Sequence, residues 1–454
     1  MNRRNISMSL MILFTASCTP TRASAQMHVE AGTLQAGMPS SQQTSTTTVP
    51  ENLTLQQAEK IAIQNHPQIQ AASYLANAAK AHVTEVRSDY YPRVFGSVTG
   101  VEAENNSRVG AGALNNSLIL TRFAQGVTVQ QLVTDFGRTH ELVKSSVLHS
   151  KAQEENVTTT REDVLLQVDA AYYNVLKAQA VLQVAQETVK DRQLVADQVT
   201  EMEKNRLKSG LDVSFANVDL SQAQLLLVQA QNNLQASFAD LSVALGLAES
   251  RTFQLSETPV PPAPPANFPT LMAQAIQSRP ELVSRRLDVN AAQSYATAQR
   301  DLWFPTISGV GVAGLIPIAE AGLGPRYAAA GFNVNIPIFN GRQFNALHAE
   351  ATAQANAQEQ YLRDTQNAIV RDLRTAWLNA NSGFQRLSIT QQLLDAANQA
   401  LDLAQQRYKL GLSSIIELSQ AQLNQTQAAI TETSAKYDYA AEISALDYQI
   451  GALK

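Results

Sequence analysis

The sequence predicts a mainly α-helical fold with a smaller β portion, arranged as two tandem repeats in a chain of 454 residues. Three observations predict it. Short motifs recur in the same order about 200 residues apart, long apolar heptad series run through both halves, and two segments alternate apolar and polar residues. Each repeat should therefore contain long helices and one β-hairpin, and the two repeats should fold alike.

An internal repeat is visible in five pairs of motifs. They pair residues 66–69 with 279–282, 90–92 with 303–305, 135–138 with 339–342, 206–211 with 407–412, and 220–225 with 418–423. The fourth pair, at an offset of 201, makes Gly210 the equivalent of Gly411 and Ala216 the equivalent of Glu417. Five landmarks in one order indicate duplication of a structural unit.

Composition divides the chain into five segments. We assign a signal peptide, a flexible leader, a first repeat, a Pro-rich connector and a second repeat to residues 1–25, 26–52, 53–258, 259–269 and 270–454. The leader is rich in Ser, Thr, Gln and Gly, as is typical of segments that bury little apolar surface. The connector carries five prolines between Pro259 and Pro265, which neither a helix nor a sheet tolerates.

The N-terminus has the features of a secretory signal. Two arginines precede the mostly apolar segment Ile6–Ala16, and Ala23-Ser24-Ala25 supplies a small-x-small cleavage site. Cleavage after Ala25 would leave a mature chain without cysteine, because Cys18 is the single cysteine. An alternative stays open, since residues 15–18 are similar to a lipoprotein cleavage box that would make Cys18 a site of lipid attachment.

Two segments predict β-hairpins, at about residues 93–134 and about residues 306–339. Residues 122–130 and 332–338 alternate apolar and polar side chains, which is typical of strands with one apolar face. The turns between the strands are expected at residues 104–117 and 319–327.

Helices are expected before and after each hairpin. Residues from Leu53 to about Ser88 read as one helix with Thr54 as its N-cap. Between Phe136 and Leu207 the chain has no proline and a single glycine, which allows a helix of about 70 residues, or ~105 Å at 1.5 Å per residue.

Both long helices carry a heptad series. Over residues 164–199, ten of eleven positions in a 4-3 series are apolar, and Arg192 is the exception. Over residues 369–408 the matching series is interrupted at Gly383 and Thr390. A seam kept over five heptads predicts coiled-coil packing against neighbouring helices.

Motifs that look catalytic fail in their context. Gly309–Gly314 has the dinucleotide-binding spacing, but Pro317 prevents the helix which that motif requires. Asp135-Phe136-Gly137 lacks the other kinase motifs and reads as the start of a helix. The six histidines show no metal-ligand spacing with a carboxylate. We therefore predict a protein that is not an enzyme, with no catalytic residue, no metal and no cofactor.

Charge and hydropathy exclude two further classes. Lys and Arg number 34 against 39 Asp and Glu, a net charge of −5, whereas nucleic-acid binding needs a clustered basic surface. No run of 18 apolar residues exists, so no transmembrane helix is readable.

Two tandem units of helix, hairpin and long helix pair behind a signal peptide resemble the TolC family of outer-membrane efflux proteins. The resemblance covers about residues 53–451, and its most specific pieces are the hairpin-to-helix junctions 135–138 and 339–342 and the helix–helix turns 208–211 and 408–413. It implies a homotrimer in which long coiled-coil hairpins form an α-barrel tunnel. The tunnel would join a 12-stranded outer-membrane β-barrel, to which each chain contributes four strands.

The resemblance also implies residue roles. Glu417 would stand at the first acidic position of an entrance constriction, Tyr408 at a tyrosine that holds the entrance shut, and Gln420 at the second acidic position, where it departs from the family. For Glu417 a capping box with Ser414 is an equally open reading. The contacts for a periplasmic adaptor would lie at the two tips, at Gly210, Leu211, Gly411, Leu412 and Ser413.

We thus expect a channel of the cell outer membrane with a long periplasmic extension, the exit duct of a tripartite efflux or type I secretion system. The resemblance implies outer-membrane lipid, an adaptor (membrane fusion) protein and an inner-membrane pump of RND, ABC or MFS type as partners. Alternatives from another class are a periplasmic coiled-coil adaptor, which has one hairpin flanked by small β domains, or a coiled-coil scaffold.

Overall fold

A computed structural model describes residues 52–104, 108–111, 114–118, 121–319 and 324–453. The expected signal peptide with Cys18, and all but the last residue of the expected leader, lie outside the described residues. The described part belongs to one unit, Val49–Lys454.

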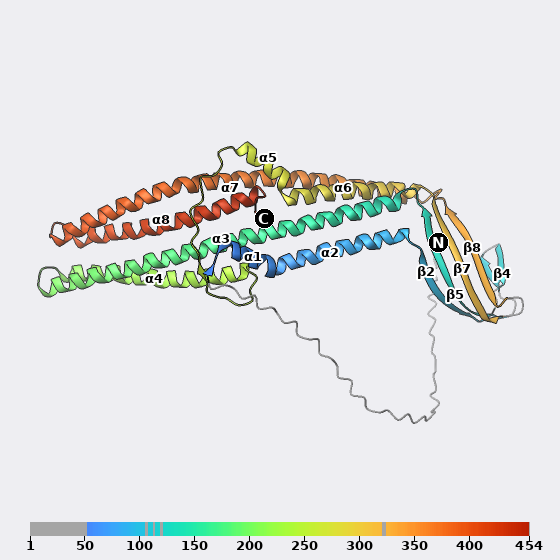
Figure 1. The fold of residues 1–454 in the computed structure, drawn as a ribbon, viewed down its shortest axis with the longest axis horizontal. Helices are drawn as coiled ribbons and strands as arrows, with labels where there is room; N and C mark the ends of the chain where they lie inside the picture. The colour runs from blue at the N-terminus through green and yellow to red at the C-terminus, as the bar shows by residue number, and fades with distance from the viewer. Residues whose placement is uncertain (1–51, 105–107, 112–113, 119–120, 320–323, 454) are drawn as a thin grey trace, which may run out of the picture. The chain divides into compact units, whose positions relative to one another are not determined.

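The helices occur twice, in the same order and with equal lengths (Figure 1). The first set comprises α1 (Leu55–Asn65), α2 (Pro67–Arg87), η1 (Ser88–Tyr90), α3 (Arg138–Lys204) and α4 (Gly210–Ala244). The second set comprises α5 (Phe268–Ser278), α6 (Pro280–Arg300), η2 (Asp301–Trp303), α7 (Gln343–Lys409) and α8 (Ile415–Gln449). Both α3 and α7 have 67 residues, which corresponds to about 100 Å at 1.5 Å per residue.

The helix expected over Leu53–Ser88 is broken into α1 and α2. The break is at His66, whose φ of −68° and ψ of 123° are extended because the next residue is Pro67. His66 then caps α2, since its Nδ1 accepts a hydrogen bond of 3.3 Å from the Gln68 amide. Thr54 is the N-cap of α1, as expected, and forms a complete capping box with Gln57.

The four longest strands form one antiparallel sheet of order β2-β5-β7-β8. Its strands are β2 (Arg93–Val101), β5 (Arg122–Thr134), β7 (Thr306–Ala319) and β8 (Arg326–Asn335). Each half supplies two strands, and β5 and β7 join the halves. A further parallel pair, β1 (Asn52–Leu53) with β6 (Gln254–Leu255), ties the start of the described chain to the segment after α4.

Two details of the expected hairpins were wrong. Residues 104–117 were expected as a turn, but they include β3 (Arg108–Ala111) and the start of β4 (Leu114–Leu118), which pair with each other. The last strand was expected to reach Ile338 but ends at Asn335. Pro337 has no amide hydrogen for the ladder, and this explains the early end.

The long helices form two hairpins, α3 with α4 and α7 with α8, and the contact of α3 with α8 joins the two hairpins. Helix α3 packs against α4 within its own hairpin and against α2, α6 and α8, while α7 packs against α8 and α6. All positions of both heptad series are buried or half-buried, Arg192 included. The predicted coiled-coil packing is thereby confirmed. None of the helices in the described ranges is long and apolar enough to cross a membrane.

The C-terminal ends of α4 and α8 rest against the breaks between the short helices. Gly246, with φ +73°, lies so close to the α1–α2 break that an added Cβ would be 2.8 Å from the His66 Cα. Gly451, with φ +70°, approaches the α5–α6 break, where a Cβ would be 2.9 Å from the Ser278 Oγ. Arg279, at that break, donates to the Tyr448 carbonyl at the end of α8.

A buried carboxyl group lies where α1, α3 and α8 meet. Asp169 of α3 is 1% exposed, and burial raises its pKa to about 7. A hydrogen bond to Ser444 lowers the pKa, while the charges of Glu59 and Asp447 raise it further. Burial also raises the pKa values of Glu59 and Asp447. Tyr173, beside this group, has a raised pKa for the same main reason.

Gly246→Ala should lower the free energy of unfolding by about 1–3 kcal/mol more than Gly341→Ala. Both glycines have a positive φ, which disfavours alanine at either position. At Gly341, however, nothing lies within 4 Å of an added Cβ. Thermal unfolding followed by circular dichroism measures the difference. Equal losses for the two variants would show that the α1–α2 break does not pack on Gly246.

Stability should fall as pH rises from about 4 to about 7, and Asp169→Asn should flatten this fall. In that range folded Asp169 holds its proton, because its pKa of about 7 is above the unfolded value of 3.8, whereas the unfolded chain has released it. The measurement is the urea midpoint at pH 5, 6, 7 and 8. Substitution of the exposed Asp364 by Asn is the control and should leave the slope unchanged. An unchanged slope for Asp169→Asn would contradict the account.

Candidate functional site at the two helical tips

The two long hairpins reverse direction through turns of the same geometry. After α3 the chain turns at Arg206, with φ +58°, and after α7 it turns at Gly411, with φ +75°. The Leu207 amide donates to the Met202 carbonyl and the Leu412 amide to the Arg407 carbonyl, each at 2.8 Å. These six-to-one bonds close the helix ends in the manner of a Schellman motif.

The equivalence of the tips differs from the one expected from sequence. Helices α3 and α7 end at Lys204 and Lys409, and the N-caps of α4 and α8 are Ser209 and Ser414. The offset is therefore 205 and not 201. With the offset of 205, Gly411 is equivalent to Arg206. Gly210 is equivalent to Ile415, and each of these two is the first residue of its helix. The error of four residues is about one helical turn, which preserves the hydrophobic pattern.

The corrected offset also changes the partner of Glu417, which is Asp212 and not Ala216. Both acids stand three residues after a serine N-cap. Asp212 forms a complete capping box, because its Oδ2 accepts from the Ser209 amide at 2.9 Å while the Ser209 Oγ accepts from the Asp212 amide at 3.3 Å. Partial burial would raise the pKa of Asp212, but the bonds from Ser209 and the charge of Lys208 lower it overall.

Glu417 makes only half of the expected capping box. Its amide donates to the Ser414 Oγ at 3.4 Å, but its carboxylate turns to Arg407, whose Nε lies 3.2 Å from the Glu417 Oε1. About half of each of these two side chains is exposed. The pair therefore spans the second turn at the surface and links the end of α7 to the start of α8.

Tyr408 connects the two tips. Its side chain is 4% exposed and packs in a cluster with Ala196 and Val199 of α3 and Ile415 of α8. The Lys208 ammonium, from the first turn, lies 3.9 Å from the centre of its ring. Its hydroxyl is buried and has no hydrogen-bond partner among the described residues. Burial, with the charge of Asp212, raises the pKa of Tyr408 to about 12.

The remaining expected site residues lie at the surface of the tips. Gln420 is exposed one turn after Glu417, and its amide donates to the Asn424 Oδ1 at 2.9 Å. Gly210 and Gly411 are exposed, and Ser413 is half-buried. The exposed aliphatic side chains of the tips are Leu211, Leu412, Leu207, Leu410 and Ile416, all at 60% or more.

Sequence reasoning missed three of these aliphatic residues, and also Arg407 and Lys208. The signal for Leu207, Leu410 and Ile416 was present, since they are large apolar residues in polar turns or next to an N-cap. Arg407 was overlooked because the offset of 201 matched it to Arg206, which hid its place in the last turn of α7.

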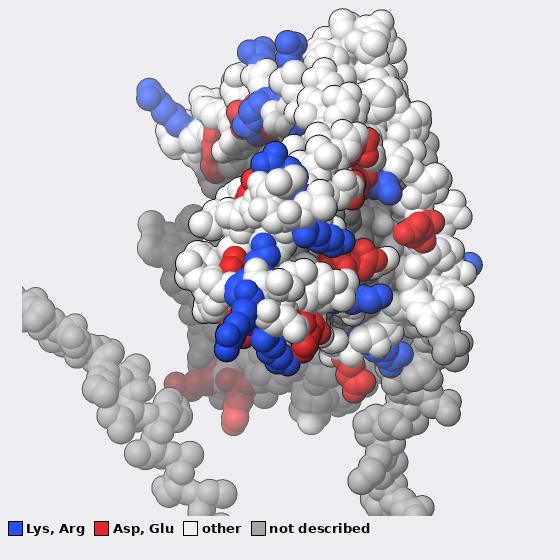
Figure 2. Space-filling view, turned by 90° about the vertical axis from the view of Figure 1, so that its left-hand side faces the viewer, with Lys and Arg blue, Asp and Glu red and all other residues white. Residues whose placement is uncertain are grey.

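The tips carry mixed charge (Figure 2). Residues 201–212 and 407–417 contain five basic side chains, Lys204, Arg206, Lys208, Arg407 and Lys409, and four acidic ones, Glu201, Glu203, Asp212 and Glu417. The acidic excess of the whole chain is therefore not concentrated here. Across the described ranges, no group of three or more His, Cys, Asp or Glu residues is placed to hold a metal ion.

Comparison with protein families decides the identity of this fold. A profile described as outer membrane efflux protein matches residues 60–247 and 271–452, which is most of the chain and falls into the same two halves. The chain belongs to the outer membrane efflux protein family. It is therefore related to TolC, and the outer membrane is its location.

Known relatives are similar over most of their length. The toluene efflux pump outer membrane protein TtgC of Pseudomonas putida is 23% identical over 386 residues, which cover 82% of this chain and 77% of TtgC. The outer membrane protein TolC of Escherichia coli is 22% identical over 403 residues, which cover 85% of this chain and 79% of TolC.

Solved structures share the fold. A membrane protein from Pseudomonas aeruginosa gives a TM-score of 0.78 at 21% identity, over 87% of this chain and 90% of that one. The Campylobacter jejuni CmeC outer membrane channel gives a TM-score of 0.75 at 17% identity, over 88% of this chain and 85% of that one. The expected fold class, long helical hairpins joined to a β portion, is thereby confirmed.

Proposed function

We propose that three copies of this chain form the passive exit duct of a tripartite efflux or type I secretion system. The observation that carries the proposal is an uncovered heptad seam on α7. Ile389, Leu393 and Leu403 are each at least 49% exposed, and two exposed alanines continue their 4-3 series. Arg407 interrupts the series before the exposed Leu410, which caps the end of α7. A second uncovered series on α4 places Leu211, Val218 and Leu225 seven residues apart.

Exposed apolar seams of this kind are expected to pack against further helices. Helix α4 packs on α3 and helix α7 packs on α8, so the two uncovered seams flank the central α3–α8 contact. Apolar seams at heptad spacing are typical of coiled-coil partners, and in a closed ring the α7 seam of one copy would meet the α4 seam of the next. The homotrimer implied by the family fits this arrangement, with 3 × 4 = 12 strands in a shared barrel.

The two faces of the sheet differ in polarity, which fits one face toward the membrane and one toward water. Asn333 pairs with Ser308, and both line a polar cavity of about 390 Å³ that also includes Arg93 and Gln130. Their neighbours Val334 and Ile307 pair on the opposite face. We infer that the face of Phe332 and Val334 meets lipid, and that the face of Asn333 and Asn335 meets the water-filled lumen. Ile336 and Ile338, which follow the end of β8, would lie at the boundary of the barrel and the membrane.

The tips are the proposed docking end. Their exposed aliphatic side chains would receive the helical hairpin of a periplasmic adaptor, which connects the duct to an inner-membrane pump. The names of relatives such as TtgC, which include an efflux pump, support this assignment. Glu417, Tyr408 and Gln420 would then surround the entrance, with Arg407 as a further member of the group.

Val127→Arg should impair assembly in the outer membrane, whereas Thr128→Arg should not. The two residues are neighbours in the middle of β5 and lie on opposite faces of the sheet, with Val127 on the face of Phe332. An arginine facing lipid near the midplane costs about 2–4 kcal/mol. The measurement is the yield of folded protein in outer-membrane fractions. Equal yields would contradict the assignment of the faces.

Glu417→Gln should weaken block of the channel by di- and trivalent cations, and Arg407→Gln should strengthen it. Three carboxylates around one opening attract cations, and the paired Arg407 side chains oppose that attraction. Gln420→Ala is the control and should change block little. Single-channel recording in planar bilayers measures the effect. If Glu417→Gln leaves cation block and selectivity unchanged, Glu417 only stabilises the second turn. If the wild-type protein does not conduct, the proposed duct itself is wrong.

A further inference from the structure

An arginine is buried between the two hairpins, away from the tips. Arg192 of α3 interrupts the apolar heptad series and is only 7% exposed. Its Nη2 donates to the Thr426 Oγ1 of α8 at 3.1 Å. Burial lowers the pKa of Arg192, and the charges of Asp219 and Asp191 act in the opposite direction. This buried cation thus gives its cross-hairpin hydrogen bond to a neutral hydroxyl.

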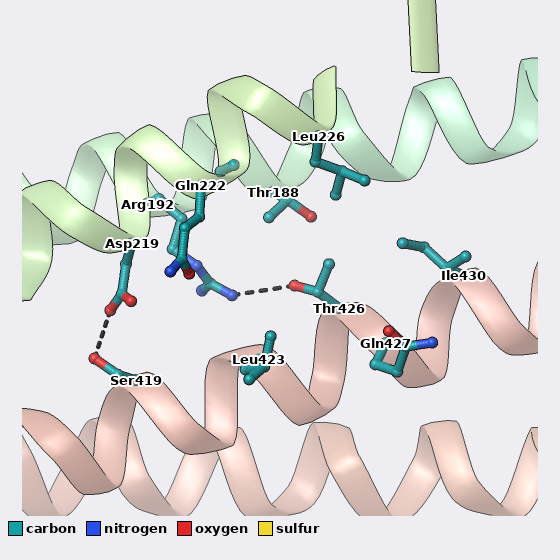
Figure 3. A pocket seen from close by; sticks show the side chains of 11 residues that line it. Thr188, Arg192, Asp219, Gln222, Leu226, Ser419, Leu423, Thr426, Gln427 and Ile430 are labelled. Atoms are coloured by element: carbon teal, nitrogen blue, oxygen red, sulfur yellow. Dashed lines mark hydrogen bonds between the residues drawn. The ribbon is translucent and has the colours of Figure 1, made fainter. Parts of the chain in front are cut away.

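A carboxylate lies close to it on the same hairpin. Asp219 of α4 accepts a hydrogen bond from the Ser419 hydroxyl of α8. Figure 3 shows that both bonds cross the same gap, from the α3–α4 hairpin to α8. The opposite charges of Arg192 and Asp219 therefore belong to one hairpin, while their hydroxyl partners belong to the other.

The gap gives these side chains room to move. A cavity of about 220 Å³ lies between α3, α4 and α8, and Arg192, Asp219, Ser419 and Thr426 all line it. Gln222 and Gln427 add polar groups to the wall, and Leu226, Leu423 and Ile430 close its apolar side (Figure 3). The cavity borders Arg192 and Asp219 alike, and it is the space into which the Arg192 guanidinium would turn.

We propose that these four residues form a partner-exchange latch between the hairpins. In the attached state, seen here, Arg192 binds Thr426 and Asp219 binds Ser419. When α8 moves away, Arg192 and Asp219 bind each other within the α3–α4 hairpin, and the two hydroxyls turn to water. An ion pair forms as two cross-hairpin bonds are lost, so that separation leaves no buried charge alone.

The latch rests on the proposed function, since opening of the entrance would require one hairpin to move past the other. The contact of Lys208 with Tyr408 joins the hairpins at the tips. The latch joins them farther along the helices, 16 residues before Lys208 in the chain. It would therefore set how readily the hairpins part without itself narrowing the entrance.

Substitutions on α8 and on the α3–α4 hairpin should change the population of the separated state in opposite directions. Thr426→Val and Ser419→Ala remove the cross-hairpin bonds and keep the ion pair, so each should raise the separated population by about fivefold, the factor that one net hydrogen bond is worth. Asp219→Asn keeps an acceptor for Ser419 but abolishes the ion pair, so it should lower that population. Thr431→Val, elsewhere on α8, is the matched control and should have no effect.

The test is the distance distribution between nitroxide labels on Gln224→Cys of α4 and Asn424→Cys of α8, both exposed positions, in full-length protein. Open probability in planar bilayers is recorded in parallel. Opposite shifts for Thr426→Val and Asp219→Asn in the label distances support the latch. If the label distances of the two variants shift in the same direction, or do not shift, in protein that conducts, the latch is overturned. If the label distances shift as expected but the protein never conducts, the proposed duct fails and the latch stands.

Discussion

The structure depends on apolar heptad seams carried by helices too long to be enclosed by one chain. A 67-residue helix can bury one side against its own hairpin partner and neighbours, and the buried positions of α3 and α7 do so. On α4 and α7, a second series of apolar side chains remains exposed. Hydrophobic burial dominates folding and association, so this exposed apolar surface is the basis of our proposal that further copies of the chain cover it.

Within the seams, polar groups appear at a few places that join different parts of the chain. Arg192 meets α8, Tyr408 meets the first turn, and Asp169 meets α1 and α8. A directional contact, such as a hydrogen bond or a cation over an aromatic ring, forms only in one register, because its partner must be opposite it. Each of these residues therefore fixes the position of one hairpin relative to another where an all-apolar seam would permit sliding.

Sequence patterns predicted most of the fold and less of the site. The heptad series, the alternating strands and the repeated motifs predicted the long helices and the four-stranded sheet, because their periods reflect burial directly. The break at His66 was missed although Pro67 marked it, since the apolar pattern continues across it. The tip equivalence was missed because an error of one helical turn conserves the pattern, and only the serine caps reveal it. The pairing of Glu417 with Arg407 depends on side-chain direction, which periodicity does not encode.

We propose above that further copies of the chain cover the exposed seams of α4 and α7. Native mass spectrometry of the mature protein, extracted from outer membranes in mild detergent, tests it most directly. The wild-type protein should have the mass of three copies, and it should be found as single copies when Leu393 and Leu403 of the α7 seam are both replaced by glutamate. A wild-type protein found as single copies, or a trimer that survives both glutamates unchanged, would contradict it.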